Sequence, residues 1–512
     1  MPVPVPVTAT EPDASTGRAM PTARVRPTER VTPTELRARF AERLSALYGR
    51  EVPAYNTLVE VSQQVNERVL ARLGASAERL GSLSRVTAER HGAIRVGSPR
   101  ELAQVGRIFA AFGMVACGFY DLRDARPRPI PVVATAFRPL ERDELAINPF
   151  RVFTSMLVPE DRRFFDADLS GRLSTFLDRR ELFPAELLTL ADRAVAEQEL
   201  TGADAERFLD LATAAFALSP EPVDAAWYAE LEAVSSVAAD IGGVRSTHIN
   251  HLTPRVLDID DLYVSMQQRG LEMIDRIQGP PRWHGPDILL RQTSFRALAE
   301  PRRFRHADGS VTEGSLRVRF GEVEARGIAL TPSGRDLYER MVRTVDERMA
   351  GRDDRDRGEV AAEVWADQLP ATEIGLWREG LGYFTYRVEE NSLDRAGAIG
   401  GSVGSMVGGS VGSGIEGESD AASTAELVDS GILVPEPIVY EDFLPRSAAG
   451  IFASNLTGTG TVEDVQGGAE RSREWMAGVI GADVAVPEEV YAAESLQSLE
   501  NARRTLAGRA VR

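Results

Sequence analysis

The sequence predicts a mixed α+β fold in which short strands and helices build the core and a helical block is inserted between them. Three observations support this fold class. Segments rich in Val, Ile and Phe, at 130–137 and 316–330, are typical of strands. Apolar residues recur at helical spacing through 169–231. Two distant segments also share one order, an extended stretch, a helix cap and then a helix, which predicts two similar strand–helix modules.

The N-terminal stretch, residues 1–30, repeats Pro, Val, Thr and Ala and has no basic segment followed by an apolar run. We therefore expect a disordered leader and not a signal peptide. Order is expected to begin near Thr32, because a Thr cap, a Pro in the first turn and Glu35 form a capping box. The main domain is predicted to run from residue 31 to residue 456.

Three further segments complete the predicted organisation. We expect the helical insertion at about 160–235 and a C-terminal helical extension at 457–512. A Gly-rich stretch at 397–420 contains a Gly-x-Gly-x-x-Gly spacing that starts at Gly412 and matches dinucleotide-binding turns. No apolar strand leads into this stretch, so we expect a flexible surface loop.

The composition excludes several kinds of chemistry. The 512 residues carry a net charge of −18 and contain no Lys, which excludes a Schiff-base lysine and a phosphate-loop lysine. A pI near 5.0 argues against a broad surface for nucleic acid or anionic membrane. The single Cys117 excludes an intrachain disulfide and a thiolate metal cage. No apolar run approaches the roughly 20 residues that span a bilayer, so we expect a cytoplasmic protein.

Five histidines are available for imidazole chemistry, and two of them stand in the repeated pattern. His91 and Arg95 precede a Ser-Pro helix start, and His251 and Arg255 precede an Asp-rich one. Residues i and i+4 of a strand point to the same face, so each segment would present one imidazole and one guanidinium together. We expect two pseudo-symmetric modules whose sheets meet across a shared cleft.

A metal held by His91 and His251 needs a third ligand, and the segment 316–327 offers two acids. Glu322 and Glu324 would share one face of a single predicted strand. Two His and one carboxylate form the ligand set of non-haem Fe(II) sites, which leaves three positions open for substrate and oxygen. The alternative is that both acids line a solvated face and pair with Arg side chains.

The other three histidines are not expected to bind the metal. His248 lies an odd number of residues from His251, so it would face the opposite way on a strand. His284, in a Pro-rich loop, and His306, in a polar turn, are predicted to lie at the surface.

Five motifs in the same order along the chain resemble the bacterial 2-oxoadipate dioxygenase/decarboxylase family over roughly residues 58–455. The motifs are RHGAIR (90–95), INPFRVFTSML (147–157), THINHLTPR (247–255), FGEVEARGIALTP (320–332) and EPIVYEDFLPRSAAGIF (436–452). The resemblance implies the vicinal-oxygen-chelate fold, with paired βαβββ modules around a central metal cleft. It also implies conversion of 2-oxoadipate and O2 to 2-hydroxyglutarate and CO2 in lysine breakdown, in chemistry similar to that of hydroxymandelate synthase.

The resemblance assigns the metal ligands. His91, His251 and Glu322 would bind Fe(II), because the ligand acid of the family directly follows the Phe-Gly pair of the FGEVEAR strand. The same-face geometry keeps Glu324 as the alternative third ligand.

The resemblance also assigns the substrate contacts. Arg95 would be the catalytic residue that binds the distal carboxylate, since the guanidinium fork grips a carboxylate in bidentate fashion. The turn with Arg446 and Ser447 would contact the substrate through Ser447 and backbone groups. Arg446 stands where the family has a small aliphatic residue.

Two rival functions would use the same residues. A metal-dependent isomerase or lyase on the same fold would use Zn, Ni or Mn and consume no oxygen. A non-catalytic protein that binds small acids would lack an open metal position. The sequence leaves the oligomeric state open.

Overall fold

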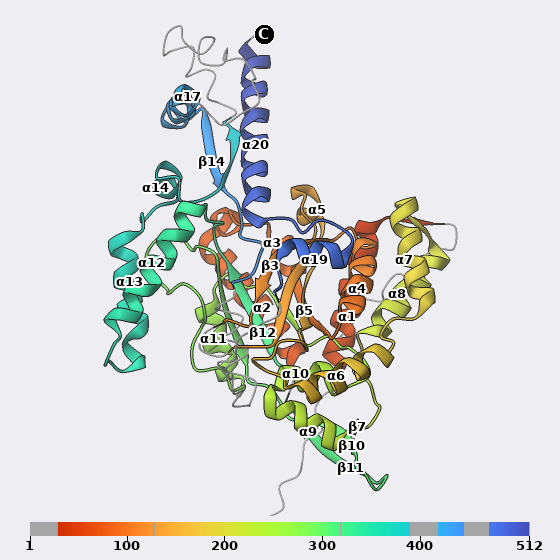
Figure 1. The fold of residues 1–512 in the computed structure, drawn as a ribbon. Helices are drawn as coiled ribbons and strands as arrows, with labels where there is room; N and C mark the ends of the chain where they lie inside the picture. The colour runs from red at the N-terminus through yellow and green to blue at the C-terminus, as the bar shows by residue number, and fades with distance from the viewer. Residues whose placement is uncertain (1–28, 126–128, 318, 390–417, 445–469, 511–512) are drawn as a thin grey trace, which may run out of the picture.

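The computed structural model describes residues 29–125, 129–317, 319–389, 418–444 and 470–510 (Figure 1). Residues 1–28 of the predicted leader, almost all of the Gly-rich stretch, and both Arg446 and Ser447 lie outside these residues.

The first helices form as the capping signals predict. Helix α1 (Pro33–Glu51) starts at Thr32, whose hydroxyl accepts from the Glu35 amide while the Glu35 carboxylate accepts from the Thr32 amide. Helices α2 (Ala54–Leu73) and α3 (Leu83–Ala88) follow. The predicted capping box is therefore confirmed.

The central sheet has five strands in the order β3-β4-β5-β2-β8. The chain forms β2 (Arg90–Val96), helix α4 (Pro99–Ala110), β3 (Val115–Asp121), β4 (Val132–Arg138), the short α5 (Arg142–Ile147) and β5 (Arg151–Leu157). Strand β2 pairs in parallel with β5 and antiparallel with β8. The first module thus has the order strand, helix and three strands, with one short helix before the last strand.

The second strand–helix unit places its first strand in this sheet and its other two strands in a separate two-stranded sheet. It comprises β8 (His251–Pro254), α11 (Ile259–Gln268), β9 (Leu290–Phe295) and β12 (Gly321–Arg326). Strand β12 pairs antiparallel with β9, and a bridge between Arg255 and Glu324 joins it to the end of β8. A hairpin of β10 (Glu300–Arg305) and β11 (Val311–Leu316) interrupts the unit between β9 and β12.

The expected single strand across 316–330 is wrong. Strand β11 ends at Leu316 and β12 spans only Gly321–Arg326. Between them the Arg319 guanidinium pairs with Glu300, and the Phe320 ring stacks on His251. Both side chains are buried, whereas consecutive side chains of a strand point to opposite faces, so this stretch is not a strand.

The predicted repeat is confirmed at the level of secondary structure. Each histidine segment is a strand followed by a capped helix. Ser98 accepts a hydrogen bond from the Glu101 amide at the start of α4, and Asp258 accepts one from the Asp261 amide at the start of α11.

Helices occupy the stretch between the two modules. They are α6 (Ala167–Arg179), α7 (Ala185–Glu197), α8 (Gly202–Ala215), α9 (Ala225–Val234) and α10 (Ser236–Gly242). Helices α7 and α8 lie beside α4 and α1 (Figure 1), and Leu187 and Phe208 share one buried cluster with Phe40 and Phe109. These helices therefore extend the main core.

The C-terminal elements complete the fold. They are α12 (Pro332–Arg348), α13 (Arg357–Gln368), α14 (Glu373–Arg378), β13 (Phe384–Val388), α17 (Glu418–Asp429), β14 (Leu433–Pro437), α19 (Arg473–Ile480) and α20 (Pro487–Ala510). Helix α19 packs on α4, and α20 packs on β13 (Figure 1). The short strands β1 (Arg30–Val31) and β6 (Leu200–Thr201) pair with each other, and β7 (Val223–Asp224) pairs with β10.

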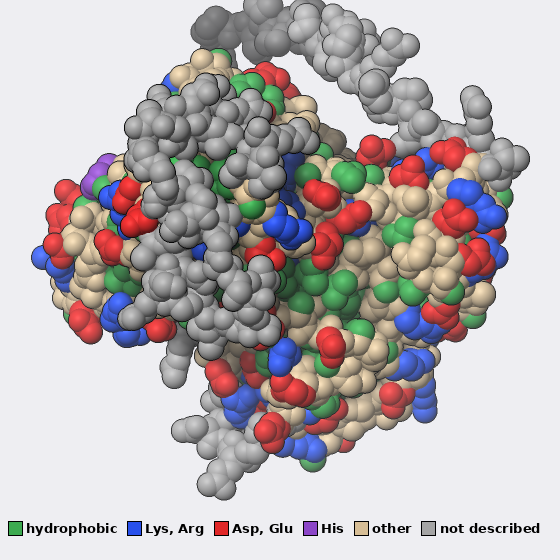
Figure 2. Space-filling model, turned by 90° about the horizontal axis from the view of Figure 1, so that it is seen from above, with side chains coloured by type: hydrophobic (Ala, Val, Ile, Leu, Met, Phe, Trp, Pro, Cys, Tyr) green, Lys and Arg blue, Asp and Glu red, His purple; other side chains and the backbone are tan. Residues whose placement is uncertain are grey.

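The surface agrees with the composition. On the face seen in Figure 2, acidic and basic side chains are interspersed and form no broad basic area. Within the part of the chain that is described, no helix is long and apolar enough to cross a membrane. Cys117 is buried as a free thiol.

Candidate metal centre

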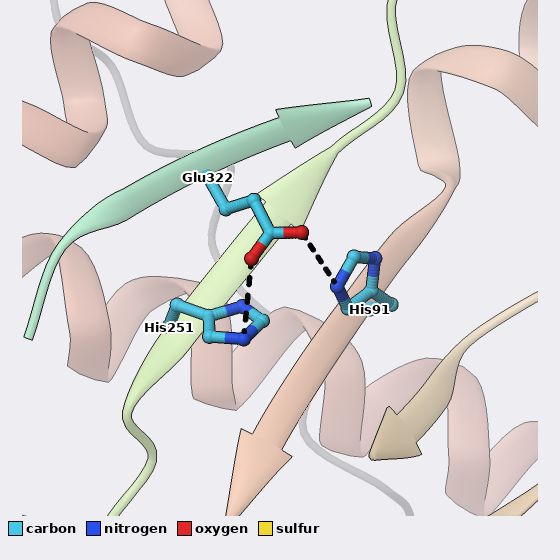
Figure 3. Close-up of side chains that lie close together, drawn as sticks. All are labelled: His91, His251 and Glu322. Carbon is cyan, nitrogen blue, oxygen red and sulfur yellow. Dashed lines mark ion pairs between the residues drawn. The ribbon is translucent and has the colours of Figure 1, made fainter. Parts of the chain in front are cut away.

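Three strands bring two imidazoles and one carboxylate to a single point (Figure 3). His91 lies on β2, His251 at the start of β8, and Glu322 on β12. One ligand atom from each lies within 4.8 Å of the others, and all three side chains are buried. Glu322 Oε1 is 3.6 Å from His91 Nε2, and Glu322 Oε2 is 3.5 Å from His251 Nε2. This group could therefore hold a metal ion.

Local sequence explains why the third ligand arrives here. Gly321, the residue before Glu322, pairs with Phe295 across β9. A Cβ at Gly321 would lie 1.8 Å from Cε1 of the Phe295 ring, so the glycine leaves the space in which that ring packs. Packing against Phe295 thus explains the glycine that directly precedes Glu322.

Glu322 and Glu324 share one face of β12, as predicted, but have different partners. Glu324 Oε2 lies 3.0 Å from His91 Nδ1, and both Glu324 oxygens accept from the Arg326 guanidinium at 2.6 and 3.0 Å. Glu324 therefore orients the His91 ring from behind while Glu322 faces the ligand atoms. This geometry favours Glu322 as the third ligand.

The electrostatics of the two acids separate them further. Burial raises the pKa of Glu322 well above its usual range, and the nearby Glu324 charge raises it more. Burial would raise the pKa of Glu324 too, but Arg326 and His91 outweigh it and hold that pKa well below its usual range. Arg326 lowers the pKa of Glu322 only as the smallest of these influences, and no described arginine forms an ion pair with Glu322, so a divalent cation would favour its ionised form.

The two imidazoles are suited to bind a metal because they are neutral. Burial lowers the pKa of His91 and, more strongly, that of His251. His251 Nδ1 lies 3.0 Å from the Thr253 hydroxyl, which leaves Nε2 directed at Glu322. Each ring thus has a partner behind it that sets its orientation.

Three residues beside the group were given no role by the sequence, although Phe320 and Phe443 stand in two of its motifs. Gln292 on β9 donates from Nε2 to Glu322 Oε1. The rings of Phe443 and Phe320 pack edge-on against His91 and face-on against His251, with centroids 5.0 and 5.5 Å apart. These aromatic contacts come from segments far apart in the chain, so periodicity could not reveal them.

A set of buried charges, here called the buried arginine network, lies behind the metal group. It consists of Arg85, Arg151, Arg255, Arg326, Glu89, Glu324 and Glu441. Glu89 pairs with Arg151 and lies 3.0 Å from Arg255 and 3.3 Å from Arg326. Arg326 links the network to Glu324, and Arg151 links it to Glu441. The strands that carry the histidines are thereby tied together by ion pairs.

The remaining predicted residues fall into three groups. Arg95 is buried on β2 and pairs with Asp240 on α10. His248 is also buried beside Asp240 and takes no part in the three-residue metal group. His284 and His306 are exposed, which confirms the prediction for both. Arg446 and Ser447 lie outside the described residues.

Comparison with known proteins gives consistent matches over most of the chain. A family profile described as 2-oxoadipate dioxygenase/decarboxylase matches residues 40–455. The 2-oxoadipate dioxygenase/decarboxylase of Mycobacterium tuberculosis is 54% identical over 457 residues, 89% of this chain and 95% of that protein. The Pseudomonas putida protein of the same name is 36% identical over 482 residues, covering 92% and 97%.

A solved structure resembles the fold described above. The Pseudomonas putida hydroxyglutarate synthase in complex with 2-oxoadipate superimposes with a TM-score of 0.75 and 33% identity. The match covers 93% of this chain and 99% of that one, so it includes both strand–helix modules and the helices between them.

Proposed function

The chain belongs to the 2-oxoadipate dioxygenase/decarboxylase family, and we propose that it is an Fe(II)-dependent enzyme that converts 2-oxoadipate and O2 to 2-hydroxyglutarate and CO2. The observation that carries the proposal is the buried convergence of His91, His251 and Glu322. The reaction balances with one dioxygen per substrate and no further reductant. Relatives of that name, and a solved relative with 2-oxoadipate bound, support the substrate.

The donor set supports iron as the metal. His91, His251 and Glu322 would hold the ion, and two imidazoles with one carboxylate are the ligand set of non-haem Fe(II) sites. When bound, iron supplies the centre that chelates the 2-oxo acid and activates dioxygen. The chain's own part is to present neutral His91 and His251, to hold His91 through Glu324, and to exclude water with Phe443 and nearby rings.

The substrate contacts are proposed for Arg95, Ser447 and Arg446. Arg95 lies four residues after His91 on β2, and its charge acts on His251, which supports its reach into the same space. A guanidinium there suits the far carboxylate of a diacid. Phe443 packs on His91, and Ser447 follows it by four residues, which supports a role for that turn beside the metal.

The arrangement of strands supports a fold of paired modules. The first unit, β2 to β5, has one helix and three further strands after its first strand. The second has β8, α11, β9 and β12. Met273 and Gln278 form isolated bridges to β9, on the edge that does not pair with β12. We propose that these are the two βαβββ modules of a vicinal-oxygen-chelate fold, with the metal between them.

Oxygen uptake is the deciding experiment. The full chain, loaded anaerobically with Fe(II), should consume O2 on addition of 2-oxoadipate and release CO2 in equal amount. His306→Ala should behave as wild type, because His306 is exposed on the β10–β11 hairpin. Turnover of the acid without oxygen uptake would favour an isomerase or lyase, and binding without turnover would favour a binding protein.

A further inference from the structure

A second buried polar cluster surrounds Asp240 on α10. The Asp240 carboxylate pairs with the Arg95 guanidinium through Oδ2, which also accepts from Asn250 Nδ2 at 3.0 Å. The other oxygen, Oδ1, lies 3.4 Å from His248 Nε2. All four side chains are buried, with at most 5% of each exposed. Asp240 thus contacts both the proposed substrate-binding arginine and a titratable imidazole.

The charges around this cluster are balanced within the described residues. Two further arginines, Arg302 on β10 and Arg319 before β12, act on His248, and Arg319 pairs with Glu300 and Glu51. The nearby phenols of Tyr228 and Tyr48 are neutral, because burial raises both pKa values. The cations are Arg95, Arg302 and Arg319, and the anions are Asp240, Glu300 and Glu51.

A docked diacid would disturb this balance. Its far carboxylate at Arg95 would place a fourth anion among three arginines in a buried space, where an uncompensated charge is strongly disfavoured. A 2-oxo acid with an apolar end adds no such charge. The two kinds of acid therefore make different electrostatic demands on the same cluster.

His248 is placed to supply the missing positive charge. In the neutral ring, Nε2 can accept from Asn250 Nδ2, which lies 3.1 Å away. Once protonated, the same nitrogen would donate toward Asp240 Oδ1. Burial lowers the pKa of His248 most strongly. The Asp240 charge raises this pKa, but the three arginines lower it, and the pKa is about 4. An anion docked on Arg95 would oppose the arginines and raise that pKa.

We propose that His248 and Asp240 are specificity-determining residues that take up one proton when the far carboxylate of a dicarboxylic 2-oxo acid binds at Arg95. The inference rests on the proposed function, because it takes Arg95 as the anchor of that carboxylate. The proton comes from solvent and resides on His248 Nε2 beside Asp240, and no bond of the substrate changes. Acids with an uncharged far end bind without this uptake.

Anaerobic calorimetry tests the proposal on the Fe(II)-loaded full chain. 2-Oxoadipate and 2-oxohexanoate are titrated near neutral pH in buffers of different ionisation enthalpy, which gives the protons taken up by each. Steps at the metal end are common to both acids and cancel in the comparison. We expect the diacid to take up more protons than the monoacid, by up to about one, and its affinity relative to the monoacid to fall by up to about tenfold per pH unit.

Two shape-conserving variants locate the proton. His248→Gln keeps an amide beside Asp240 but cannot be protonated, so the extra uptake should vanish and only the diacid should bind more weakly. Asp240→Asn removes the competing negative charge, so the diacid should bind without uptake and with little dependence on pH. His306→Gln is the matched control at an exposed histidine and should keep wild-type uptake.

Each outcome decides between the claims. Equal uptake by the two acids in the wild type, or full extra uptake in folded His248→Gln, would overturn the inference and leave the proposed function standing. Failure of both acids to bind the iron-loaded wild type would instead count against the proposed function. The wild-type comparison needs no variant, so misfolded variants would not remove the test.

Discussion

Glu322 and Glu324 are two residues apart on one strand, yet they belong to regions with opposite electrostatics. Glu322 lies in the metal group, where no described cation pairs with it, and its pKa is raised well above the usual range by burial. Glu324 lies in the buried arginine network, where Arg326 and His91 outweigh burial and lower its pKa. The first region could accept an added cation, whereas the second already contains its own cations.

This difference explains how a rigid site can bind a metal. Carboxylates that are satisfied by fixed arginines hold the strands in register and orient a ligand ring. A carboxylate that is left without a cation provides the affinity for the ion. The network would thus stabilise the strands and the metal group would bind the ion, from positions two residues apart on β12.

The largest expected effect follows from removing a ligand. His91→Ala, His251→Ala and Glu322→Ala should each lose stoichiometric iron and reduce oxygen uptake to background, because one of three ligands is gone. Iron content by metal analysis and oxygen electrode traces measure both quantities. His284→Ala is the matched control at an exposed histidine. Retained iron and activity in His251→Ala would disprove the ligand assignment.

The next largest effect concerns Arg95. Arg95→Ala should keep iron but lower kcat/KM for 2-oxoadipate by roughly 30- to 5000-fold, since an unpartnered carboxylate in a cleft costs about 2–5 kcal/mol. Arg95→Lys should restore only part, because an ammonium lacks the planar fork. The loss should be smaller for 2-oxohexanoate. Equal losses for both acids would make Arg95 a purely structural partner of Asp240.

Local signals in the sequence were sufficient for the helix starts but not for the contacts of the site residues. Caps at Thr32 and Ser98 depend on residues three positions away, so the helix starts were predictable. The pairing of Arg95 with Asp240 joins positions 145 residues apart, and Gln292 meets Glu322 across a strand pair. Such contacts depend on register, which no local pattern encodes.

The choice between two acids shows the same limit. A period of two placed Glu322 and Glu324 on one face, and this was right. It could not say which of them pairs with Arg326, because that depends on how β12 meets β2 and β8. The resemblance to the family selected Glu322, and the burial and ion pairs supply the physical reason.

Replacing each of the two acids by glutamine tests whether Glu324 serves stability and Glu322 serves metal binding. Glu324→Gln leaves Arg326 without its closest carboxylate, so the apo-protein should lose about 3–5 kcal/mol of unfolding free energy. Its iron affinity should fall by about 10–100-fold, because His91 loses its orienting partner. Denaturant unfolding and a metal-competition assay measure these changes.

Glu322→Gln provides the opposite pattern. It should abolish iron binding and leave the apo-protein as stable as wild type or slightly more so, because a buried carboxyl without a cation is replaced by its neutral analogue. If both variants destabilise the apo-protein equally, the division between the two regions is incorrect.

The smallest effect concerns how the network depends on pH. Burial alone would raise the pKa of Glu441, but Arg85 and Arg151 hold it well below its usual 4.5. As pH falls, the unfolded state therefore takes up its proton before the folded state does. The stability that Glu441 contributes is complete above the unfolded pKa and is lost as pH falls toward the folded pKa.

Glu441→Gln should consequently be less stable than wild type near neutral pH, and the two stability curves should converge as pH falls below about 4.5. One proton more bound by the unfolded state than by the folded state lowers the wild-type free energy of unfolding by up to about 1.4 kcal/mol for each unit that the pH falls. Denaturant unfolding at a series of pH values measures the gap. Glu186→Gln is the control, because Glu186 forms an exposed pair with Arg207 that solvent screens, so its curve should follow wild type closely. A gap for Glu441→Gln that stays constant with pH would mean that the network stabilises the fold by packing and hydrogen bonds that do not require the Glu441 charge.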